Sequence, residues 1–169
     1  KSLVKMNLLE EDFVKHLDDI IELRKKVEHK EIKKISGHEL DEWIEKTKKF
    51  VKKMQGLIMR IEVLKRENMI EKSYSIMNET LTTLLKAMNK LPEGPLAKAF
   101  EEYLVKPGLV SEQYLTVFND LEKMQAMIKE GKILELPKQQ ILINREYVRK
   151  FIREAGKIMK KNLKIETEE

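Results

Sequence analysis

The sequence predicts an all-α protein, an up-and-down helical bundle with an internal repeat of helical hairpins. Apolar residues recur at steps of three and four through most of the 169 residues, which is the spacing of one helix face. Connections between these stretches are mostly short, which favours antiparallel neighbours. Residues 10–58 and 111–159 also overlay without a gap, so that apolar positions coincide although identity is low. The coinciding pairs include Phe13 with Tyr114, Leu17 with Phe118, Leu40 with Ile141 and Phe50 with Phe151.

The composition suits long helices that are exposed to solvent. Charged residues make up 37% of the chain and cysteine is absent, which excludes disulfides and thiolate metal sites. The Lys and Glu content resembles that of heat-adapted proteins, and a merely charge-rich helical protein explains it equally well. The net charge of +5 permits phosphate contacts without demanding them, because acidic residues are interleaved with the basic ones.

Apolar runs are short and interrupted by charges, so we expect no membrane span and a cytoplasmic protein. The chain begins at Lys1 and the helical pattern starts by Leu3, from which we expect a piece of a longer protein. Residues 163–169 are predicted to be a disordered tail.

In the first half, a helix is predicted over residues 3–28, followed by a linker over 29–37. Ser36 and Glu39 have the spacing of a capping box, in which each side chain bonds the other residue's backbone amide. A long helix follows, with Gly56 tolerated inside it, and a kink or break is predicted at 66–68.

In the second half, a helix is predicted over 70–91, ended by the prolines and glycine of 92–95, and a short one over 96–105. Ser111 is the expected N-cap of a helix over 112–130, and Gly131 its expected C′ residue. The last helix follows Pro137 and is expected to extend to residue 160. Short strands at 133–136 and 141–143 remain an alternative.

The candidate site is the run from Arg24 to His29, which closes the first predicted helix. Arginine can hold a phosphate by two hydrogen bonds and histidine can move a proton near neutral pH, so Arg24 and His29 are the candidate catalytic pair. Lys25 and Lys26 are the candidate binding residues. A basic run at a helix C-terminus is also favourable through the helix dipole alone, which is the purely structural alternative.

No motif for a metal or cofactor is present, and we expect neither. The three histidines lack the Glu-x-x-His pairs of a di-iron bundle and are dispersed. Two basic clusters could follow phosphates, although such runs are usually the solvated faces of amphipathic helices. They comprise Lys46, Lys48, Lys49, Lys52 and Lys53, and Arg149, Lys150, Arg153, Lys157, Lys160 and Lys161.

The Arg24–His29 run has the Arg-x(4–6)-His form and resembles the HEPN helical domains of prokaryotes. The order of a helix ending in this motif, a linker and a long amphipathic helix is similar to theirs. The segment from Phe100 to Gly108 and the two predicted helices after it are similar to the same half of a HEPN unit. On this resemblance, residues 1–66 form part of one HEPN-like unit and residues 67–162 a second, more complete one.

The resemblance implies two kinds of function. Some HEPN proteins are ribonucleases with paired Arg and His motifs across a dimer, and others accompany a small nucleotidyltransferase. Here Lys25 stands where a small polar residue often follows the Arg, and Gln125 and Glu130 replace Arg24 and His29 in the second copy. Only half of a paired site would therefore exist.

We accordingly expect a helical accessory or substrate-binding region of a nucleotidyltransferase-type protein, without catalytic activity of its own. The first alternative is a toxin-like HEPN ribonuclease using Arg24 and His29. The second is a non-catalytic helical oligomerisation or interaction domain. The expected partners are a nucleotide or RNA phosphate, a nucleotidyltransferase domain, and a second copy in a homodimer.

Overall fold

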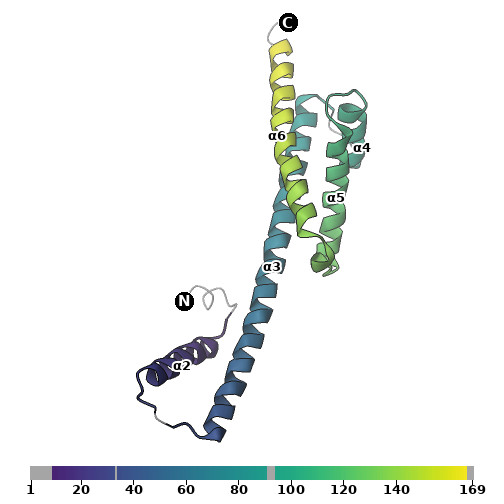
Figure 1. Cartoon of the computed structure of the whole chain (residues 1–169). Coiled ribbons are helices and arrows are strands. Elements are labelled where there is room, and N and C mark those ends of the chain that lie inside the picture. The colour runs from purple at the N-terminus through teal and green to yellow at the C-terminus, as the bar shows by residue number, and fades with distance from the viewer. Residues whose placement is uncertain (1–8, 33, 91–93, 167–169) are drawn as a thin grey trace. The chain divides into compact units, whose positions relative to one another are not determined.

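A computed structural model describes residues 9–32, 34–90 and 94–166 of the chain, with side chains as far as residue 161. Its elements are helices, as Figure 1 shows, so the predicted all-α bundle is confirmed. The alternative of short strands is wrong. Ile133–Glu135 forms one turn of 3₁₀ helix, because Ile133 turns into the core, and residues 141–143 lie inside a helix that begins at Lys138.

The chain divides into two compact units, Lys1–Glu62 and Val63–Glu169. The division falls within α3, the helix Gly37–Ala87, and the boundary after residue 66 that the HEPN resemblance implies stays a prediction. That either unit is HEPN-like stays a prediction.

The N-terminal unit consists of α2, Glu11–Glu28, and the first part of α3. The helix predicted to begin near Leu3 begins at Glu11, since Leu9 and Glu10 are not helical and residues 3–8 lie outside the described part. The two helices meet near Lys53, whose Nζ lies 2.6 Å from Glu10 Oε1 and 5.1 Å from the centre of the Phe13 ring.

The capping box at the start of α3 is confirmed. The Glu39 amide donates to Ser36 Oγ at 3.1 Å, and the Ser36 amide donates to Glu39 Oε2 at 2.9 Å. These two bonds satisfy backbone donors that the first turn of a helix leaves without intrahelical partners. The bond from the Ser36 amide holds the pKa of Glu39 below its ordinary value.

The predicted break at residues 66–68 is wrong, because α3 continues through them as regular helix. Arg66 and Glu67 are good helix formers, and neither glycine nor proline lies nearby to interrupt the backbone bonds. Arg66 Nη1 also donates to the Leu136 carbonyl at 2.9 Å, which fixes this turn of α3 against the linker before α6. The helix ends at Ala87, four residues before the predicted end.

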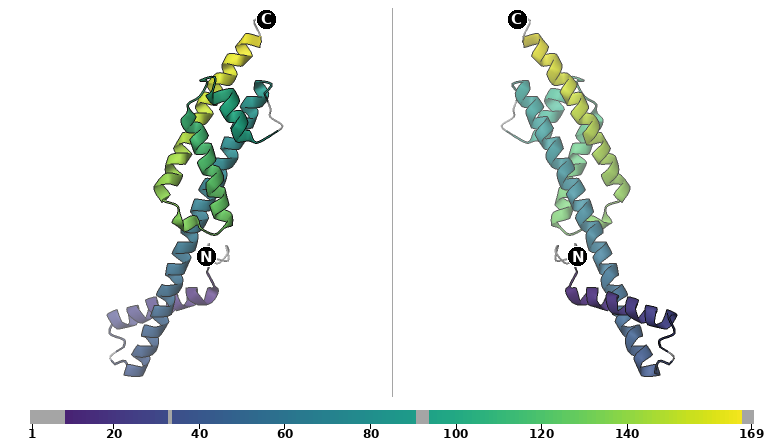
Figure 2. Two further views of the ribbon diagram at one scale, coloured as in Figure 1. Left: turned by 90° about the vertical axis from the view of Figure 1, so that its right-hand side faces the viewer. Right: turned by 90° about the vertical axis from the view of Figure 1, so that its left-hand side faces the viewer.

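The C-terminal unit packs the last part of α3 and five further segments around a dense core. Figure 2 shows α5 and α6 beside the last part of α3 in both of its views. The segments after α3 are α4 (Leu96–Phe100), a π-helical turn (Glu101–Val105), α5 (Glu112–Lys129), the 3₁₀ turn and α6 (Lys138–Glu166). The helix predicted over 96–105 is therefore α4 and its π-helical continuation.

Three fully buried phenylalanines join the elements of this unit. The Phe100 ring lies 6.0 Å from Phe118 on α5 and 5.2 Å from Phe151 on α6, between ring centres. Burial of a large apolar side chain contributes about 1.5–3 kcal/mol, so this cluster is a main source of the unit's stability. Other residues of the core include Ile70, Met77, Leu81, Leu84, Leu104, Leu121, Ile141 and Val148.

The predicted helix ends of this unit are also observed. Ser111 Oγ accepts from the Gln113 amide at 3.3 Å, as an N-cap does, and Gly131 follows α5 with a left-handed φ of 71°. Pro137 directly precedes α6, and its carbonyl accepts from the Gln140 amide at 3.0 Å. The last helix is longer than predicted and ends at Glu166; residues 167–169 of the predicted tail lie outside the described part.

The two predicted repeats share their helix bounds but not their burial. Shifting α2 by 101 positions gives the bounds of α5, and the same shift moves the start of α3 to the start of α6. However, α2 has no buried residue whereas α5 buries five. The internal repeat therefore stays a prediction. None of the described helices is long and apolar enough to cross a membrane.

Candidate functional site

The predicted pair Arg24 and His29 lies on an exposed helix end. Arg24 Nε donates to Glu28 Oε1 at 2.7 Å, one turn further along α2, and this bond raises the pKa of Arg24 above its ordinary value. His29 is the exposed C-cap residue of α2. Among the described residues, no hydrogen bond or ring contact joins the two side chains, so that the structure does not bring them together.

The predicted binding residues are arranged in the same way. Lys26 Nζ lies 2.7 Å from Glu22 Oε1, and this contact raises the pKa of Lys26 and lowers that of Glu22. Lys25 is exposed in the last turn of α2. None of these residues belongs to the lining of the two grooves described below. A role for the motif in catalysis or binding stays a prediction.

A groove with a volume of about 570 Å³ lies in the C-terminal unit, between α3 and α6. That volume is within the range of ~300–1,000 Å³ of ligand sites in proteins. Ten residues line it, and none of them is acidic or aromatic. They are Lys65, Asn68, Met69, Lys72, Ser73, Ile76, Arg145, Val148, Arg149 and Ile152. We call this the α3–α6 groove.

Helical spacing explains why these side chains converge. On α3, residues 65, 69, 72 and 76 follow one another at steps of four and three and so share one face. On α6, residues 145, 149 and 152 do the same. Basic residues therefore stand on both walls, and the apolar side chains between them form the floor.

The cations of this groove are largely available to a ligand. Arg149 Nη1 is bonded to Glu146 Oε1 at 2.6 Å, on its own helix. Within the described part of the chain, Lys65, Lys72 and Arg145 form no ion pair. All four are exposed, whereas Ser73 is buried and its hydroxyl donates to the Met69 carbonyl at 2.7 Å. The groove thus offers a positive rim around apolar side chains, and of its four cations Arg149 is paired with an acidic residue of its own helix.

A second cationic groove lies in the N-terminal unit, with a volume of about 510 Å³. Four cations of α3 line it, together with Gly56, Leu57 and the Phe13 ring of α2. These cations are Lys49, Lys52, Lys53 and Arg60. We call this the α2–α3 groove. Gly56, predicted only as a tolerated weak position in the helix, leaves open space at the point where a side chain would stand.

Sequence reasoning anticipated part of these grooves. Lys49, Lys52, Lys53 and Arg149 belong to the basic clusters that it noted. Lys65, Lys72 and Arg145 lie outside those clusters, and helix packing brings them together; Arg60 of the α2–α3 groove also lies outside them. The signal that could have found them is the spacing of seven between Lys65 and Lys72 on α3 and of four between Arg145 and Arg149 on α6, beside apolar residues of the same faces. The described residues contain no group of three or more side chains that could hold a metal ion.

The fold and the grooves define an all-α protein with a cationic, apolar-floored cleft between two helices. Comparison of the chain with protein-family models, with curated proteins and with solved structures finds no match. The resemblance to HEPN domains and the link to nucleotidyltransferases receive no support from these comparisons and stay predictions.

Proposed function

We propose that the protein is a non-catalytic helical interaction domain that binds an acidic amphipathic helix of a partner protein in the α3–α6 groove. The observation that supports this most directly is the apolar floor of Met69, Ile76, Val148 and Ile152 between two basic walls. An amphipathic helix places its apolar face in such a groove and its acidic flanks beside the cations.

The geometry favours a helix over a nucleic acid. No aromatic ring lines the groove, whereas proteins that bind single strands stack bases on aromatic side chains. Four lining cations along two helices, with exposed apolar side chains between them, match a ligand that carries both charge and apolar surface. The predicted association with a nucleotidyltransferase would make that enzyme the partner; a Gly-Ser and paired-Asp motif in an accompanying chain or segment would support this.

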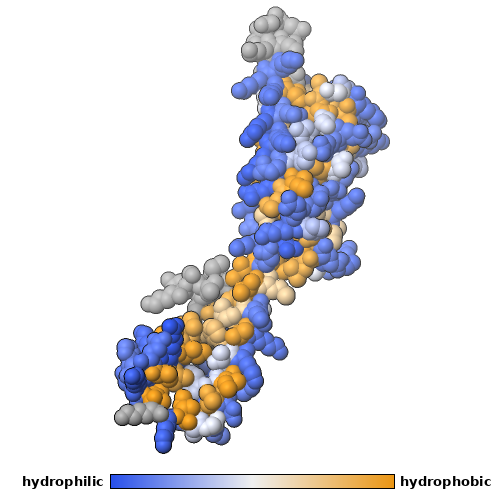
Figure 3. Space-filling view, in the orientation of Figure 1, coloured by the Kyte–Doolittle hydropathy of each residue, from blue (hydrophilic) through white to orange (hydrophobic). Residues whose placement is uncertain are grey.

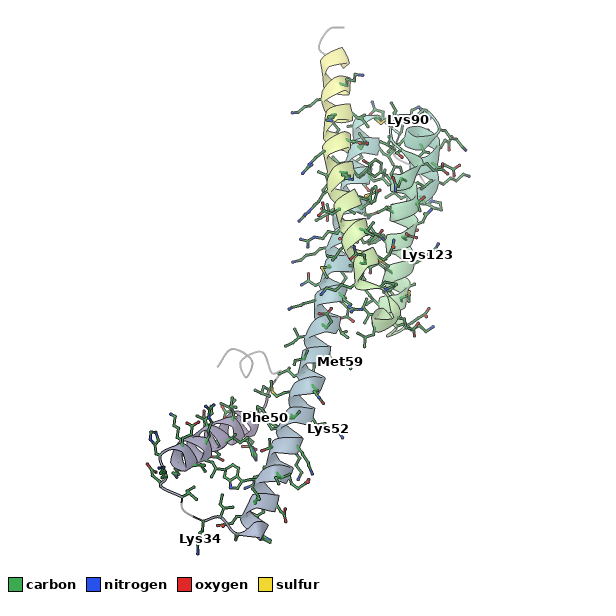
Figure 4. The ribbon with its side chains drawn as sticks, viewed as in Figure 1. Lys34, Phe50, Lys52, Met59, Lys90 and Lys123 are labelled. Atoms are coloured by element: carbon green, nitrogen blue, oxygen red, sulfur yellow. The ribbon has the colours of Figure 1, made fainter. Side chains whose placement is uncertain are left out.

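The test is binding of a labelled synthetic helix with Leu on one face and Glu on both flanks, measured by fluorescence anisotropy. We expect the Lys72→Glu, Arg145→Glu double variant to lose at least roughly tenfold in affinity, which corresponds to ~1.4 kcal/mol. Ile76→Ser should also weaken binding, because it removes part of the floor. Lys123→Glu reverses one charge on α5, outside the groove lining, and should bind as the wild type does (Figure 4).

Two results would contradict the proposal. One is equal binding by the wild type and the double variant. The other is binding of an RNA oligonucleotide that the double variant loses and Ile76→Ser retains, since this would identify the groove as a phosphate site.

A second candidate function is the binding of a phosphate-bearing ligand, nucleotide or RNA, in the α2–α3 groove. It is favoured by the four cations there and by the Phe13 ring beside Lys53. Calorimetry with a nucleotide or a short RNA tests it, with Lys49→Glu, Arg60→Glu as the variant and His29→Ala as a control. Cleavage of RNA that His29→Ala abolishes would instead support the ribonuclease alternative with Arg24 and His29.

A further inference from the structure

The first part of α3 carries an apolar stripe with the period of a coiled coil. Seven positions follow one another at alternating steps of four and three residues. They are Leu40, Ile44, Thr47, Val51, Met54, Ile58 and Ile61. In a heptad written abcdefg these residues alternate between positions d and a, beginning with Leu40 at d. The three a positions hold Ile44, Val51 and Ile58, which are all β-branched. This arrangement is typical of helices that pair along such a seam.

Much of this stripe is open to solvent in the described structure. Leu40, Ile44, Val51 and Ile58 are exposed by 48%, 42%, 46% and 65%. α2 covers only part of this stretch of α3. Leu57, on the neighbouring row, is 5% exposed and lines a groove with Phe13 of α2, and Ile44 and Thr47 of the stripe line a smaller groove with Ile20 and Leu23 of α2. Figure 3 shows apolar side chains gathered over the N-terminal unit on the face turned to the viewer. Single exposed apolar residues need no explanation, but a continuous row of them marks an interaction surface.

In the α5–α6 hairpin, the residues equivalent to exposed apolar residues of the α2–α3 hairpin are buried by neighbouring helices. Under the predicted overlay, Leu17 and Leu40 correspond to Phe118 and Ile141, which are 0% and 2% exposed. There α5 and α6 belong to a core that also includes α4 and the last part of α3. Leu17 and Leu40 are 41% and 48% exposed. The α2–α3 hairpin thus consists of two helices, whereas α5 and α6 pack with two further helices.

Charge is kept off the stripe. Lys46, Lys49, Lys52 and Lys53 occupy b, c and f positions of the heptads, which turn away from a paired helix. Between residues 40 and 61, the flanking e positions hold Asp41, Lys48 and Gln55, of mixed sign. Two copies of this basic stretch can therefore approach along the stripe without a block of like charges.

We propose that a second copy of this chain covers the stripe, so that two α2–α3 hairpins form a four-helix bundle around a two-fold axis. In a two-fold dimer the same surface of each copy meets its counterpart, so a surface with one sign of charge would repel itself. The stripe is apolar and its flanking residues are of mixed sign, so that two copies can pair. The apolar surface available per copy is on the order of 500 Å². It comes from six side chains that are each about half exposed: the four stripe residues named above, and Leu17 and Ile21 of α2. Because about 60–65% of an interface is apolar, this corresponds to ~800 Å² per copy, which is the size of a stable interface.

The test is the molar mass of the whole chain by light scattering and sedimentation equilibrium across a concentration series. We expect a dimer that dissociates on dilution, and a monomer for the Ile44→Lys, Ile58→Lys double variant at every concentration. Both positions are exposed within one chain, so circular dichroism should show unchanged helix content. Met59→Lys is the matched control, because Met59 is 59% exposed and lies beside the stripe at a b position (Figure 4). It should remain a dimer.

Each other outcome overturns the proposal. A wild type that is monomeric throughout leaves no second copy to cover the stripe, and a dimer that survives both lysines uses a different surface. A trimer or tetramer contradicts the two-fold bundle. The α3–α6 groove is not involved, so that binding of the acidic helix by either variant is a separate result.

Discussion

At the residue scale, one tyrosine links α5 to α6 through a partly buried hydrogen bond. Tyr114 is 5% exposed, and its hydroxyl donates to Glu154 Oε1 at 2.9 Å. Burial, reinforced by the bond to Glu154, raises the pKa of Tyr114 to about 12 from an ordinary 10.0. The proton is therefore held more tightly in the folded protein than in the unfolded chain.

The pH dependence follows from the sign of that shift. The stabilisation is fully present below pH 10, where Tyr114 is protonated in both states, and is lost as the pH rises from 10 towards 12. Tyr114→Phe should lower the free energy of unfolding by about 1 kcal/mol near neutral pH and flatten its decline at high pH. Urea unfolding across this pH range measures both effects.

The matched control is Tyr103→Phe, which keeps the ring that lies 5.6 Å from Lys90 Nζ. If Tyr114→Phe and the wild type lose stability equally above pH 10, the Tyr114–Glu154 bond is not the source of the pH dependence.

Residue-scale features separate what the sequence could predict from what it could not. Ser36, Ser111 and Gly131 were predictable, because caps and left-handed positions are local. The burial of Asn144 was not predictable, because the pattern of α6 places apolar residues at buried positions. Its side chain is fully buried, accepts from Gln140 and donates to the Met124 sulfur. The cations of the α3–α6 groove were not predictable either, since they meet only through the packing of distant helices.

At the element scale, three helices end in the same way. The residue two positions after α2, α3 and α5 adopts a left-handed conformation, and these residues are Lys30, Asn89 and Gly131. In each case the next amide bonds back over five residues, as in Lys132 N to Met127 O at 2.9 Å and Glu31 N to Lys26 O at 2.9 Å. This is the Schellman motif, which satisfies carbonyls at the helix end.

Lys30 and Gly131 occupy equivalent positions, with φ of 60° and 71°, but only Gly131 suits that conformation at no steric cost. Gly131→Ala should therefore lower the free energy of unfolding by about 1 kcal/mol, and Lys30→Gly should raise the stability of the N-terminal unit by roughly 0.5 kcal/mol. Thermal unfolding measures the first change and amide hydrogen exchange of α2 the second.

Asn89→Gly serves as the comparison, since asparagine tolerates the left-handed region and little gain is expected there. A loss of stability in Lys30→Gly would show that the Lys30 side chain matters more than its backbone strain.

The same scale shows where element prediction fails. The long α-helices were predicted correctly, because their apolar period of three and four is regular, whereas the π-helical turn at Glu101–Val105 and the 3₁₀ turn at Ile133–Glu135 were not predicted. The length of α3 was predicted wrongly. Residues 66–68, which are Arg, Glu and Asn, include no apolar residue and so resemble a connection between two helices. Arg66 and Glu67 are nevertheless good helix formers, and Arg66 also bonds the Leu136 carbonyl, a contact between residues seventy positions apart that no local pattern shows.

At the scale of the whole molecule, the two units differ in how complete their cores are. The C-terminal unit buries most of the residues that its apolar pattern marks, whereas in the N-terminal unit only Leu57 is buried among the described residues. The sequence could not predict this asymmetry, since both hairpins carry similar stripes. Burial depends on which further elements are available, and those lie after residue 62.

The C-terminal unit therefore has a complete core, whereas the N-terminal hairpin, on our proposal, is completed by a second copy. Amide hydrogen exchange of the whole chain at low and high protein concentration tests this difference most directly, because it reports each helix separately. We predict strong, concentration-independent protection in α5 and α6, and protection in α2 and residues 40–61 that rises with concentration and is lost in Ile44→Lys, Ile58→Lys. Equal protection of α2 and α5 at every concentration would contradict it.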